Sequence, residues 1–167
     1  MNSHFTYYSP LGPIIIGAEN NLLTQVCFSG QELNSASFPE ELQRETTEQL
    51  DAYFQGTLFS FNLPLFSENG TNFQQQVWQT TLTIPYGQTR TYGQLANILG
   101  NKRQARTIGM ANARNQLLLL IPCHRVIGAG NQLSGYAGGI WRKKWLLQHE
   151  RNHCPLFLNN DQQSSLF

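Results

Sequence analysis

The segment TYGQLANILGNKRQARTIGMANAR, residues 91–114, contains two helical patterns separated by a short polar turn. Thr91 and Gln94 stand three residues apart in the order of a capping box, which predicts a helix over 92–99. A second helix is expected from about 103 to 114. Two short helices joined by a glycine-containing turn, with arginines on the second, predict a helix-turn-helix motif. The chain around this segment should therefore be mainly helical.

The second of these helices combines small side chains with basic ones. Its small or flexible residues are Ala105, Gly109, Met110, Ala111 and Ala113, and its charge lies in Arg103, Arg106 and Arg114. This composition suits a helix that presses closely into a narrow DNA groove, where arginine can be inserted. Packing of the small residues against a neighbouring helix is the alternative interpretation.

The hexapeptide IPCHRV at 121–126 places a thiol beside a base. A nucleophilic cysteine needs an imidazole or a positive potential to hold its thiolate, and His124 and Arg125 offer both. The proline biases the residue before it toward an extended backbone, so we expect an apolar strand over 117–120 and a turn at Cys123. The alternative is a small core residue, since cysteine is among the most buried residue types.

The cysteine spacing gives no metal or redox motif. Cys27, Cys123 and Cys154 are far apart, and the chain has no CxxC pair. His149 and His153 cluster with Cys154, but we interpret them as the end of a helix and the start of a tail. We therefore expect no metal ligands.

The first third of the chain has the pattern of a small α+β unit. Alternating runs around two turn signals predict a β-meander over 5–28, and proline and glycine delimit a helix over 39–56. A further strand is predicted at 59–63, followed by a linker at 64–70. We assign 1–68 to an N-terminal α+β domain with its linker.

The remainder forms a second, mainly helical domain at 69–151. Thr71 and Gln74 repeat the capping-box spacing and predict another helix start. A last helix is expected over about 139–150. It is expected to carry Trp141 and Trp145 inward and Arg142, Lys143 and Lys144 partly outward. Residues 152–167 are interpreted as a polar C-terminal tail.

The net charge of +1 conceals a strong asymmetry. Residues 1–88 hold one basic and eight acidic side chains (−7), whereas residues 89–167 hold ten basic and two acidic ones (+8). A basic half is typical of a protein with a nucleic-acid-binding face. The alternative interpretation is a solvated charged surface that complements the acidic half. No apolar run approaches the ~20 residues of a membrane span, and the N-terminus lacks a signal-peptide pattern. We therefore expect a soluble, cytoplasmic protein.

Several motifs together resemble the O6-alkylguanine-DNA alkyltransferases. These motifs are 91–96, 105–109, Asn115, 121–126, 135–139 and 145–150. Their order and spacing agree over roughly 71–151, while 4–65 match more loosely, mainly at Ser9-Pro10-Leu11-Gly12. The resemblance implies an α+β fold, with a small ribonuclease H-like α/β domain before a winged helix-turn-helix DNA-binding domain. It also implies direct-reversal repair, in which the alkyl group of O6-alkylguanine moves irreversibly, in a single turnover, to the protein.

The resemblance also implies roles for five residues around the reacting carbon. Cys123 would accept the alkyl group, and His124 would take the thiol proton through a water. Glu150 would orient and charge-stabilise His124. Tyr92 would donate its hydroxyl proton to the leaving guanine, and Asn115 would hold the turn between the recognition helix and the active-site loop.

Further residues would contact DNA or the flipped base. Arg106 would enter the base stack in place of the extruded nucleotide. The other DNA-contacting residues would be Thr91, Gln94, Arg103, Ala105, Gly109, Met110 and Arg125, and the base pocket would be lined by Tyr136, Ala137, Gly138 and Met110. The partner would be alkylated double-stranded DNA, contacted by a monomer through the minor groove. Cooperative binding, the accepted alkyl size and action on O4-alkylthymine stay open.

The chain departs from that family in two places. Gln116 follows Asn115 where many members have proline, so a less rigid turn and slower transfer are expected. Some members bind zinc in the N-terminal domain, but the matching ligands are missing here, and neither metal nor cofactor is expected.

Three other interpretations remain. A non-enzymatic relative that binds alkylated DNA is disfavoured by Cys123, because such relatives have another residue there. A winged-helix regulator would leave the Cys-His-Glu set superfluous. A thiol hydrolase using Cys123 and His124 would leave the basic helix unexplained.

Overall fold

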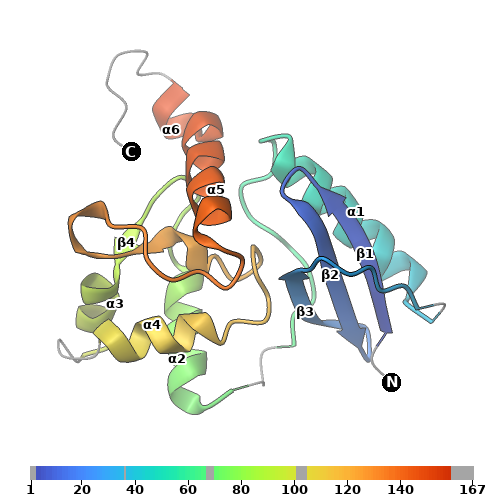
Figure 1. Cartoon of the computed structure of the whole chain (residues 1–167), viewed down its shortest axis with the longest axis horizontal. Coiled ribbons are helices and arrows are strands. Elements are labelled where there is room, and N and C mark those ends of the chain that lie inside the picture. The colour runs from blue at the N-terminus through green and yellow to red at the C-terminus, as the bar shows by residue number, and fades with distance from the viewer. Residues whose placement is uncertain (1–2, 36, 67–69, 101–104, 159–167) are drawn as a thin grey trace.

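The computed structural model describes residues 3–35, 37–66, 70–100 and 105–158. Figure 1 shows two lobes side by side, a sheet with one helix and a mainly helical part. The first lobe contains β1 (Ser3–Ser9), β2 (Gly12–Glu19), β3 (Leu22–Phe28) and α1 (Glu40–Phe54). The second contains α2 (Asn72–Leu82), β4 (Arg90–Thr91), α3 (Tyr92–Ile98), α4 (Ala105–Ala113), η1 (Cys123–Arg125), β5 (Val126–Ile127), η2 (Ala129–Asn131), α5 (Ile140–His153) and α6 (Pro155–Leu158). The predicted α+β class is confirmed.

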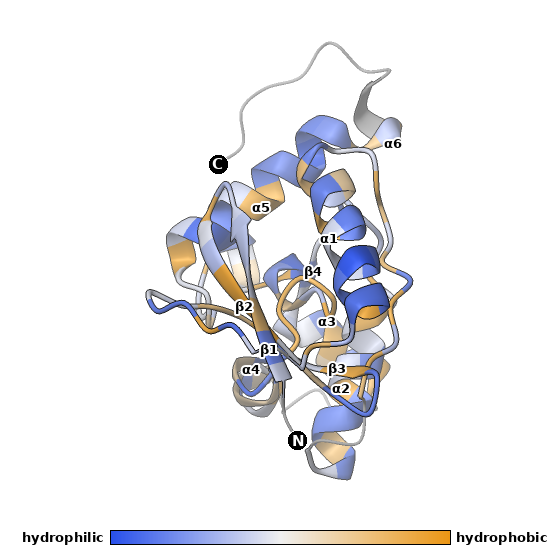
Figure 2. Ribbon diagram, turned by 90° about the vertical axis from the view of Figure 1, so that its right-hand side faces the viewer, coloured by the Kyte–Doolittle hydropathy of each residue, from blue (hydrophilic) through white to orange (hydrophobic). Residues whose placement is uncertain are grey.

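The three N-terminal strands form the predicted antiparallel meander in the order β1-β2-β3. The central strand is buried, with Ile14, Ile15 and Ile16 at most 2% exposed. Asn20 and Asn21 connect β2 to β3 at φ angles of 51° and 61°, the left-handed values of a type I′ hairpin turn. Figure 2 shows apolar residues along β2 and polar ones on the outer side of α1.

The strand predicted at 59–63 is wrong. In this stretch only Leu65, beyond the predicted strand, pairs with the sheet, through a single bridge to Leu23. The backbone of Asn62 is satisfied by the Gln49 side chain of α1, which donates to its carbonyl at 2.9 Å and accepts from its N–H at 2.8 Å. Because this side chain occupies both main-chain groups, Asn62 is held against α1 instead of a neighbouring strand.

The helix-turn-helix is formed by α3 and α4. Both predicted capping boxes are present, Thr71 with Gln74 on α2 and Thr91 with Gln94 on α3. The helix α4 packs against α2 and α3 through its buried residues, which are Ile108, Ala111 and Asn112. Arg103 and the predicted turn at 101–102 lie outside the described residues.

The expected orientation of the last helix is wrong for Trp141 and Lys143. It is correct for Trp145, which packs against the core, and for Arg142 and Lys144, which stay partly or fully exposed. Trp141 is 58% exposed, whereas Lys143 is fully buried and Arg142 and Trp145 are partly buried. The buried face of α5 follows the helical repeat through Lys143, Leu146, Leu147 and Glu150. Register therefore decides which side chains face inward, and hydropathy alone assigns Trp141 and Lys143 to the wrong sides.

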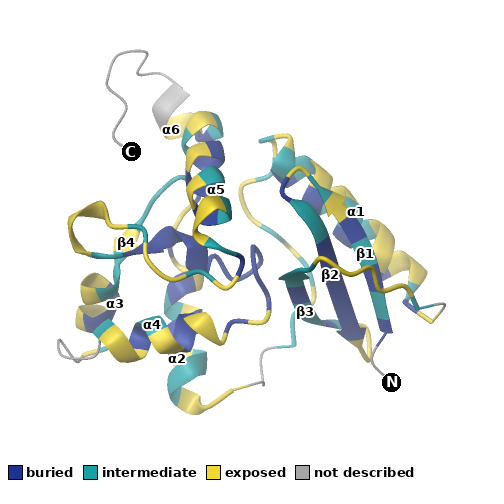
Figure 3. Cartoon of the chain, in the orientation of Figure 1, coloured by how far each residue is buried: buried dark blue, intermediate teal, exposed yellow. Residues whose placement is uncertain are grey.

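The apolar run at 117–120 is a buried turn and not the expected strand. Only Leu117 forms a bridge, a parallel one to Val26 of β3. The Val26 N–H donates to the Gln116 carbonyl at 2.7 Å, and the Leu118 N–H donates to the Val26 carbonyl at 3.0 Å. Leu119 has a positive φ of 71°, so the chain reverses several residues before the cysteine. Figure 3 shows this buried loop between the lobes, which it joins through β3.

The predicted polar tail starts too early. The helix α5 continues to His153, and Cys154, only 3% exposed, packs in the core before α6 begins. Residues 159–167 lie outside the described part of the chain. Within the described ranges, the helices are too short or too polar to cross a membrane.

Candidate active site

Cys123 begins the short helix η1 directly after the buried turn and is 5% exposed. Pro122 has φ −80° and ψ 59°, a bend that brings the Cys123 N–H to the Ile121 carbonyl at 2.8 Å. The Asn115 side-chain amide donates to Cys123 Sγ at 3.2 Å. The sulfur therefore has a fixed position and a fixed hydrogen-bond donor.

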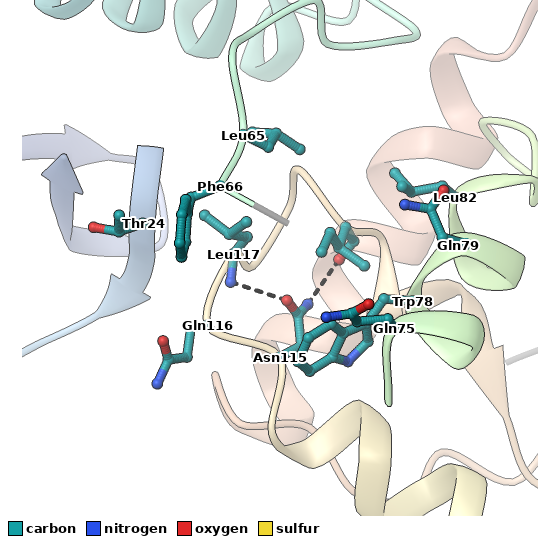
Figure 4. Close-up of a pocket in the computed structure, with 11 residues that line it drawn as sticks. Thr24, Leu65, Phe66, Gln75, Trp78, Gln79, Leu82, Asn115, Gln116 and Leu117 are labelled. Carbon is teal, nitrogen blue, oxygen red and sulfur yellow. Dashed lines mark hydrogen bonds between the residues drawn. The ribbon is translucent and has the colours of Figure 1, made fainter. Parts of the chain in front are cut away.

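Asn115 links the end of α4 to the cysteine loop. Its amide nitrogen also donates to the Ile121 carbonyl at 2.9 Å, and its oxygen accepts from the Leu117 N–H at 2.9 Å. One buried side chain thus holds three points of the turn, the position that the resemblance gives to Asn115. Figure 4 shows two of these bonds, to Leu117 and Ile121.

A small apolar cavity of about 150 Å³ borders Asn115 between the lobes. It is lined by residues from β3, the 64–70 segment, α2 and the buried turn, among them Thr24, Leu65, Trp78, Leu82, Leu117 and Ile121. Gln116 also borders it. The turn that carries the cysteine is therefore not close-packed on all sides.

The Cys123 thiol is held in a low-dielectric setting. Burial raises its pKa to about 11, while the Asn115 amide and the charge of Lys143 act in the opposite direction. The sulfur therefore needs a base that accepts its proton before it becomes a thiolate.

His124 follows Cys123 directly in η1 and is the candidate for that base. Its Nε2 lies 2.7 Å from Glu150 Oε1, and both side chains are fully buried. Burial lowers the pKa of the imidazole, so the ring is neutral. Because an ionised carboxylate can only accept a hydrogen bond, the ring proton is on Nε2. Among the described residues, His124 Nδ1 has no hydrogen-bond partner, so its lone pair is free to accept a proton.

Five donors surround the Glu150 carboxylate. Oε1 accepts from His124, from Tyr53 Oη at 2.8 Å and from Arg125 Nη2 at 3.0 Å. Oε2 accepts from Arg125 Nε at 2.9 Å and from the Gly87 N–H at 3.1 Å. Burial alone would raise the pKa of Glu150, but the His124 and Arg125 interactions outweigh it and hold that pKa well below its usual range.

The prediction that Arg125 contacts DNA is wrong. Its side chain is 7% exposed and is held by Glu150 and, at 2.7 Å, by the Ile84 carbonyl. A basic residue in a helix-turn-helix domain was expected at the surface, but this one balances the charge of Glu150. The expectation that its positive charge holds the thiolate is also unsupported by its contacts, because Lys143 is the cation that acts on the Cys123 thiol.

Tyr92 stands at the start of α3 beside an open hollow of about 640 Å³. Its hydroxyl donates to the Ser134 carbonyl at 3.2 Å. Burial, with Cys123 nearby, raises the pKa of Tyr92, so the phenol keeps its proton. A Cβ on Gly109 would come within 3.6 Å of the Tyr92 ring, so α4 approaches the tyrosine closely at this glycine.

The hollow brings together most of the residues expected to contact DNA. It is lined by Thr91, Tyr92, Gly93, Ala105, Arg106, Gly109, Met110, Ala113, Ala129, Ser134 and Gly135. Arg106 is exposed, and Met110 is 65% exposed one helical turn further on. The Thr91 and Gln94 side chains are engaged with each other's backbone as the cap of α3.

The residues expected to form the base pocket are only partly assembled. Tyr136, Ala137 and Gly138 are not among the residues that line the hollow. Gly138 is buried, and a Cβ there would lie 2.5 Å from the Tyr136 ring and 2.8 Å from Phe28 of β3. Tyr136 lies edge-on to His124, with ring centroids 6.4 Å apart. Tyr136 therefore lies behind the His124 ring, and Gly138 packs against Tyr136 and Phe28.

Lys143 is a site residue that the sequence interpretation missed. Its buried ammonium donates to the carbonyls of Val126 at 2.6 Å and Ser134 at 2.9 Å, and more weakly to Gly135. Burial lowers its pKa to about 8, with Cys123 acting in the opposite direction. Its position seven residues before Glu150, on the same helical face, is the signal that could have identified it.

The described side chains offer no cluster of metal ligands. In the described ranges, no three His, Cys, Asp or Glu side chains are grouped to hold a metal ion. His149 bonds to the Tyr53 carbonyl and His153 to the His149 carbonyl, so both rings have protein partners.

The fold and the site define a two-domain protein with a helix-turn-helix and a buried Cys-His-Glu set. Residues 72–152 match the family described as the 6-O-methylguanine DNA methyltransferase DNA binding domain, and residues 4–66 match its ribonuclease-like domain. The chain belongs to the 6-O-methylguanine DNA methyltransferase family.

Similar proteins cover nearly the whole chain. The methylated-DNA–protein-cysteine methyltransferase of Mycobacterium leprae is 45% identical over 148 residues, 86% of this chain and 89% of its own length. That of Methanosarcina acetivorans is 44% identical over 149 residues, covering 86% and 95%. A crystal structure of Mycobacterium tuberculosis OGT in complex with DNA superposes with a TM-score of 0.81 at 40% identity, covering 93% and 96% of the chains.

Proposed function

We propose that this protein repairs DNA by direct reversal, transferring the alkyl group of O6-alkylguanine to Cys123 in a single, irreversible turnover. The observation that carries the proposal is the contact set of Cys123, His124 and Glu150. The sulfur is fixed by Asn115, the imidazole has a free Nδ1, and the carboxylate fixes the other ring nitrogen. Family membership and the DNA complex of the similar mycobacterial protein support the substrate.

The chemistry is one in-line displacement. His124 Nδ1 accepts the thiol proton through a water, and a sulfur lone pair forms the S–C bond to the alkyl carbon. The C–O6 bond breaks, and its electron pair moves into guanine. Tyr92 gives its hydroxyl proton to the ring nitrogen facing it, so guanine leaves neutral. A thioether is not readily hydrolysed, so each chain acts once.

The reaction requires base flipping. A stacked guanine cannot present its O6 substituent to a sulfur that is 5% exposed, so the nucleotide must leave the duplex, at a cost of a few kcal/mol. Arg106, exposed on α4 at the hollow, fills the vacated place in the stack. Small residues on α4 permit the close approach that a minor-groove contact needs.

Mass spectrometry after incubation with O6-methylguanine duplex DNA tests the proposal. We expect the peptide that contains Cys123 to gain the mass of one methylene, with the Cys27 and Cys154 peptides unchanged. Binding without a mass gain would favour a non-enzymatic binder. Turnover of an ester or amide without a mass gain would favour a thiol hydrolase.

The Arg106→Ala protein should lose activity on duplex DNA. We expect transfer to slow by about 10-fold or more on duplex and by less than about 3-fold on single-stranded DNA, because single strands have less stacking to replace. Single-turnover rates on both substrates measure this. Arg114→Ala, which changes an exposed arginine at the end of the same helix, should affect both substrates alike. Equal losses for Arg106→Ala on the two substrates would contradict its role in the stack.

The Lys143→Met protein should lose transfer more than DNA affinity. Removing the ammonium leaves the buried Val126 carbonyl without this donor, which costs about 1–3 kcal/mol, and the Ser134 carbonyl keeps only the donor from the Tyr92 hydroxyl. The loop beside Tyr92 should then loosen, and we expect transfer to slow by roughly 10-fold or more. Lys144→Met, at the exposed neighbouring position, is the matched control. Similar rates for the two variants would show that Lys143 does not support the site.

Alkylation of Cys123 should lower the stability of the protein. The added carbon enters a buried site, and overpacking costs about 1–3 kcal/mol. The turn at 115–121 should yield first, because it borders the 150 Å³ cavity and Gln116 lacks the stiffness of proline. Thermal melts of unmodified, methylated and benzylated protein should show falling midpoints in that order. Equal or rising midpoints would mean that the site absorbs the adduct without strain.

The remaining parts of the proposal concern the setting of the reaction. The protein acts as a monomer in the cytoplasm, and cooperative binding along DNA stays open. Sedimentation of the free protein and of its complexes with DNA of increasing length measures both the oligomeric state and the cooperativity.

A further inference from the structure

We infer that Tyr53, in the N-terminal domain, is a positioning residue for the transfer reaction, acting through the hydrogen bond from its hydroxyl to the Glu150 carboxylate. The inference rests on the proposed roles of His124 and Glu150. It assigns the N-terminal domain a part in setting the basicity of the catalytic imidazole.

The contact spans the two lobes. Tyr53 lies at the end of α1 and Glu150 on α5, 97 residues apart in sequence. Both side chains are at most 1% exposed, and the Oη–Oε1 distance is 2.8 Å. Burial, with Glu150 beside it, raises the pKa of Tyr53 well above its usual value, so the hydroxyl stays a donor.

Tyr53 shares its acceptor atom with the catalytic histidine. Glu150 Oε1 accepts from Tyr53, from His124 and from Arg125, while a carboxylate oxygen offers only about two lone-pair sites. Three donors on one oxygen divide its negative charge. The Tyr53 hydroxyl therefore weakens the pull of Glu150 on the imidazolium and fixes the position of the oxygen.

Other groups also face His124 and Glu150, and they are the same in the unmodified protein and in the Tyr53 variants. The residues whose charge or ring acts on Glu150 or His124 are Arg125 from η1, Lys143 and His149 from α5, Tyr86 from the α2–β4 connection, and Tyr136 from the segment before α5. Cys123 adjoins His124 in η1. Only Tyr53 belongs to the N-terminal lobe.

The Tyr53 ring is held in place by contacts that do not involve its hydroxyl. It packs against Phe54, Phe61, Tyr86 and His149 at centroid distances of 5.2–6.0 Å. His149 Nε2 also lies 2.8 Å from the Tyr53 carbonyl oxygen. Tyr53→Phe therefore keeps the packing and the main-chain link and removes one donor.

The effect of the Tyr53 hydroxyl on His124 is measured as the pH dependence of single-turnover transfer at saturating O6-methylguanine DNA. In Tyr53→Phe the negative charge of Oε1 is shared by one donor fewer and favours the protonated imidazole, so the acid limb should move to higher pH by about 0.5–1 unit. Tyr53→3-fluorotyrosine keeps the hydroxyl as a stronger donor, and its acid limb should move to lower pH. DNA affinity should stay within about 2-fold for both, since neither change touches the DNA-binding hollow.

Tyr86→Phe is the matched control. The Tyr86 hydroxyl is buried and has no hydrogen-bond partner among the described residues. The centroid of the Tyr86 ring lies 6.0 Å from that of the Tyr53 ring. Tyr86→Phe should leave the acid limb in place. A limb in Tyr53→Phe that coincides with that of the unmodified protein, or two Tyr53 variants that shift the same way, would overturn the inference.

A second measurement separates this inference from the proposed function. The 15N chemical shifts of the His124 ring, followed through a pH titration of the DNA-free protein, should show the same ordered shifts of the imidazole pKa. If Cys123 gains no methyl but the titration shifts as expected, the proposed function fails and the link through Tyr53 stands. If methyl transfer occurs and the titration of Tyr53→Phe is unchanged, the inference fails alone.

Discussion

The Cys123→Ser protein is expected to bind alkylated duplex DNA as tightly as the unmodified protein and to transfer no methyl group. The sulfur contributes nothing to the exposed hollow lined by α3 and α4, so the dissociation constant should change by less than about 2-fold. A serine hydroxyl is far harder to deprotonate than a thiol, so transfer should fall by on the order of 10⁴-fold or more.

Single-turnover assays with labelled O6-methylguanine DNA and binding measured at one salt concentration check both halves of this expectation. Cys27→Ser is the matched control, because Cys27 lies partly exposed on β3, outside the site. It should transfer at the normal rate. Serine-variant transfer near that rate would exclude Cys123 as the acceptor, and a large loss of affinity would mean that the substitution disturbs the binding surface.

The Glu150→Gln protein is expected to lose about 3–5 kcal/mol of stability, because the buried guanidinium of Arg125 then has no counter-charge. A loss of this size lowers the melting temperature by on the order of 10 °C in a chain of this length. Transfer should also fall steeply, because His124 loses the carboxylate that stabilises its charged form.

The pH dependence of this difference has a definite sign. The pKa of Glu150 is held below its usual value of 4.5 in the folded protein, so its contribution is present above that value and is lost as the pH falls. The stability gap between the unmodified protein and Glu150→Gln should therefore narrow below about pH 4.5. Denaturant unfolding at several pH values measures the gap. Glu48→Gln, on the exposed face of α1, should cost less than about 1 kcal/mol at any pH.

Local signals predicted the framework of the site correctly. The capping boxes that start α2 and α3, the Asn20-Asn21 turn and the alternating strands depend on residues close in sequence, whose backbone preferences act within a few positions. The Pro-Cys-His-Arg motif likewise pointed to the proposed thiol and base, because they are adjacent. Asn115 and Glu150 were reached only through the resemblance to a known family.

The sequence did not predict correctly which side chains of the last helix face the protein interior. The orientations of Trp141 and Lys143 were predicted from hydropathy, but the register of α5 turns the lysine inward. There its ammonium donates to main-chain carbonyls in 126–135, which replace water as acceptors. Arg125 was assigned to DNA through the resemblance, but it is buried against Glu150. A buried charge is tolerated only with partners, and partners far along the chain leave no local pattern.

The sequence by itself determined the helix-turn-helix and the meander and placed the proposed reactive pair side by side, since each follows from short-range spacing and backbone chemistry. The tertiary structure alone decided that Tyr53, Gly87 and Arg125 converge on Glu150, and that His124 Nδ1 finds no hydrogen-bond partner in the described part of the chain. The physical reason is that a buried carboxylate is stabilised by the sum of donors that packing brings from α1, the α2–β4 connection and η1.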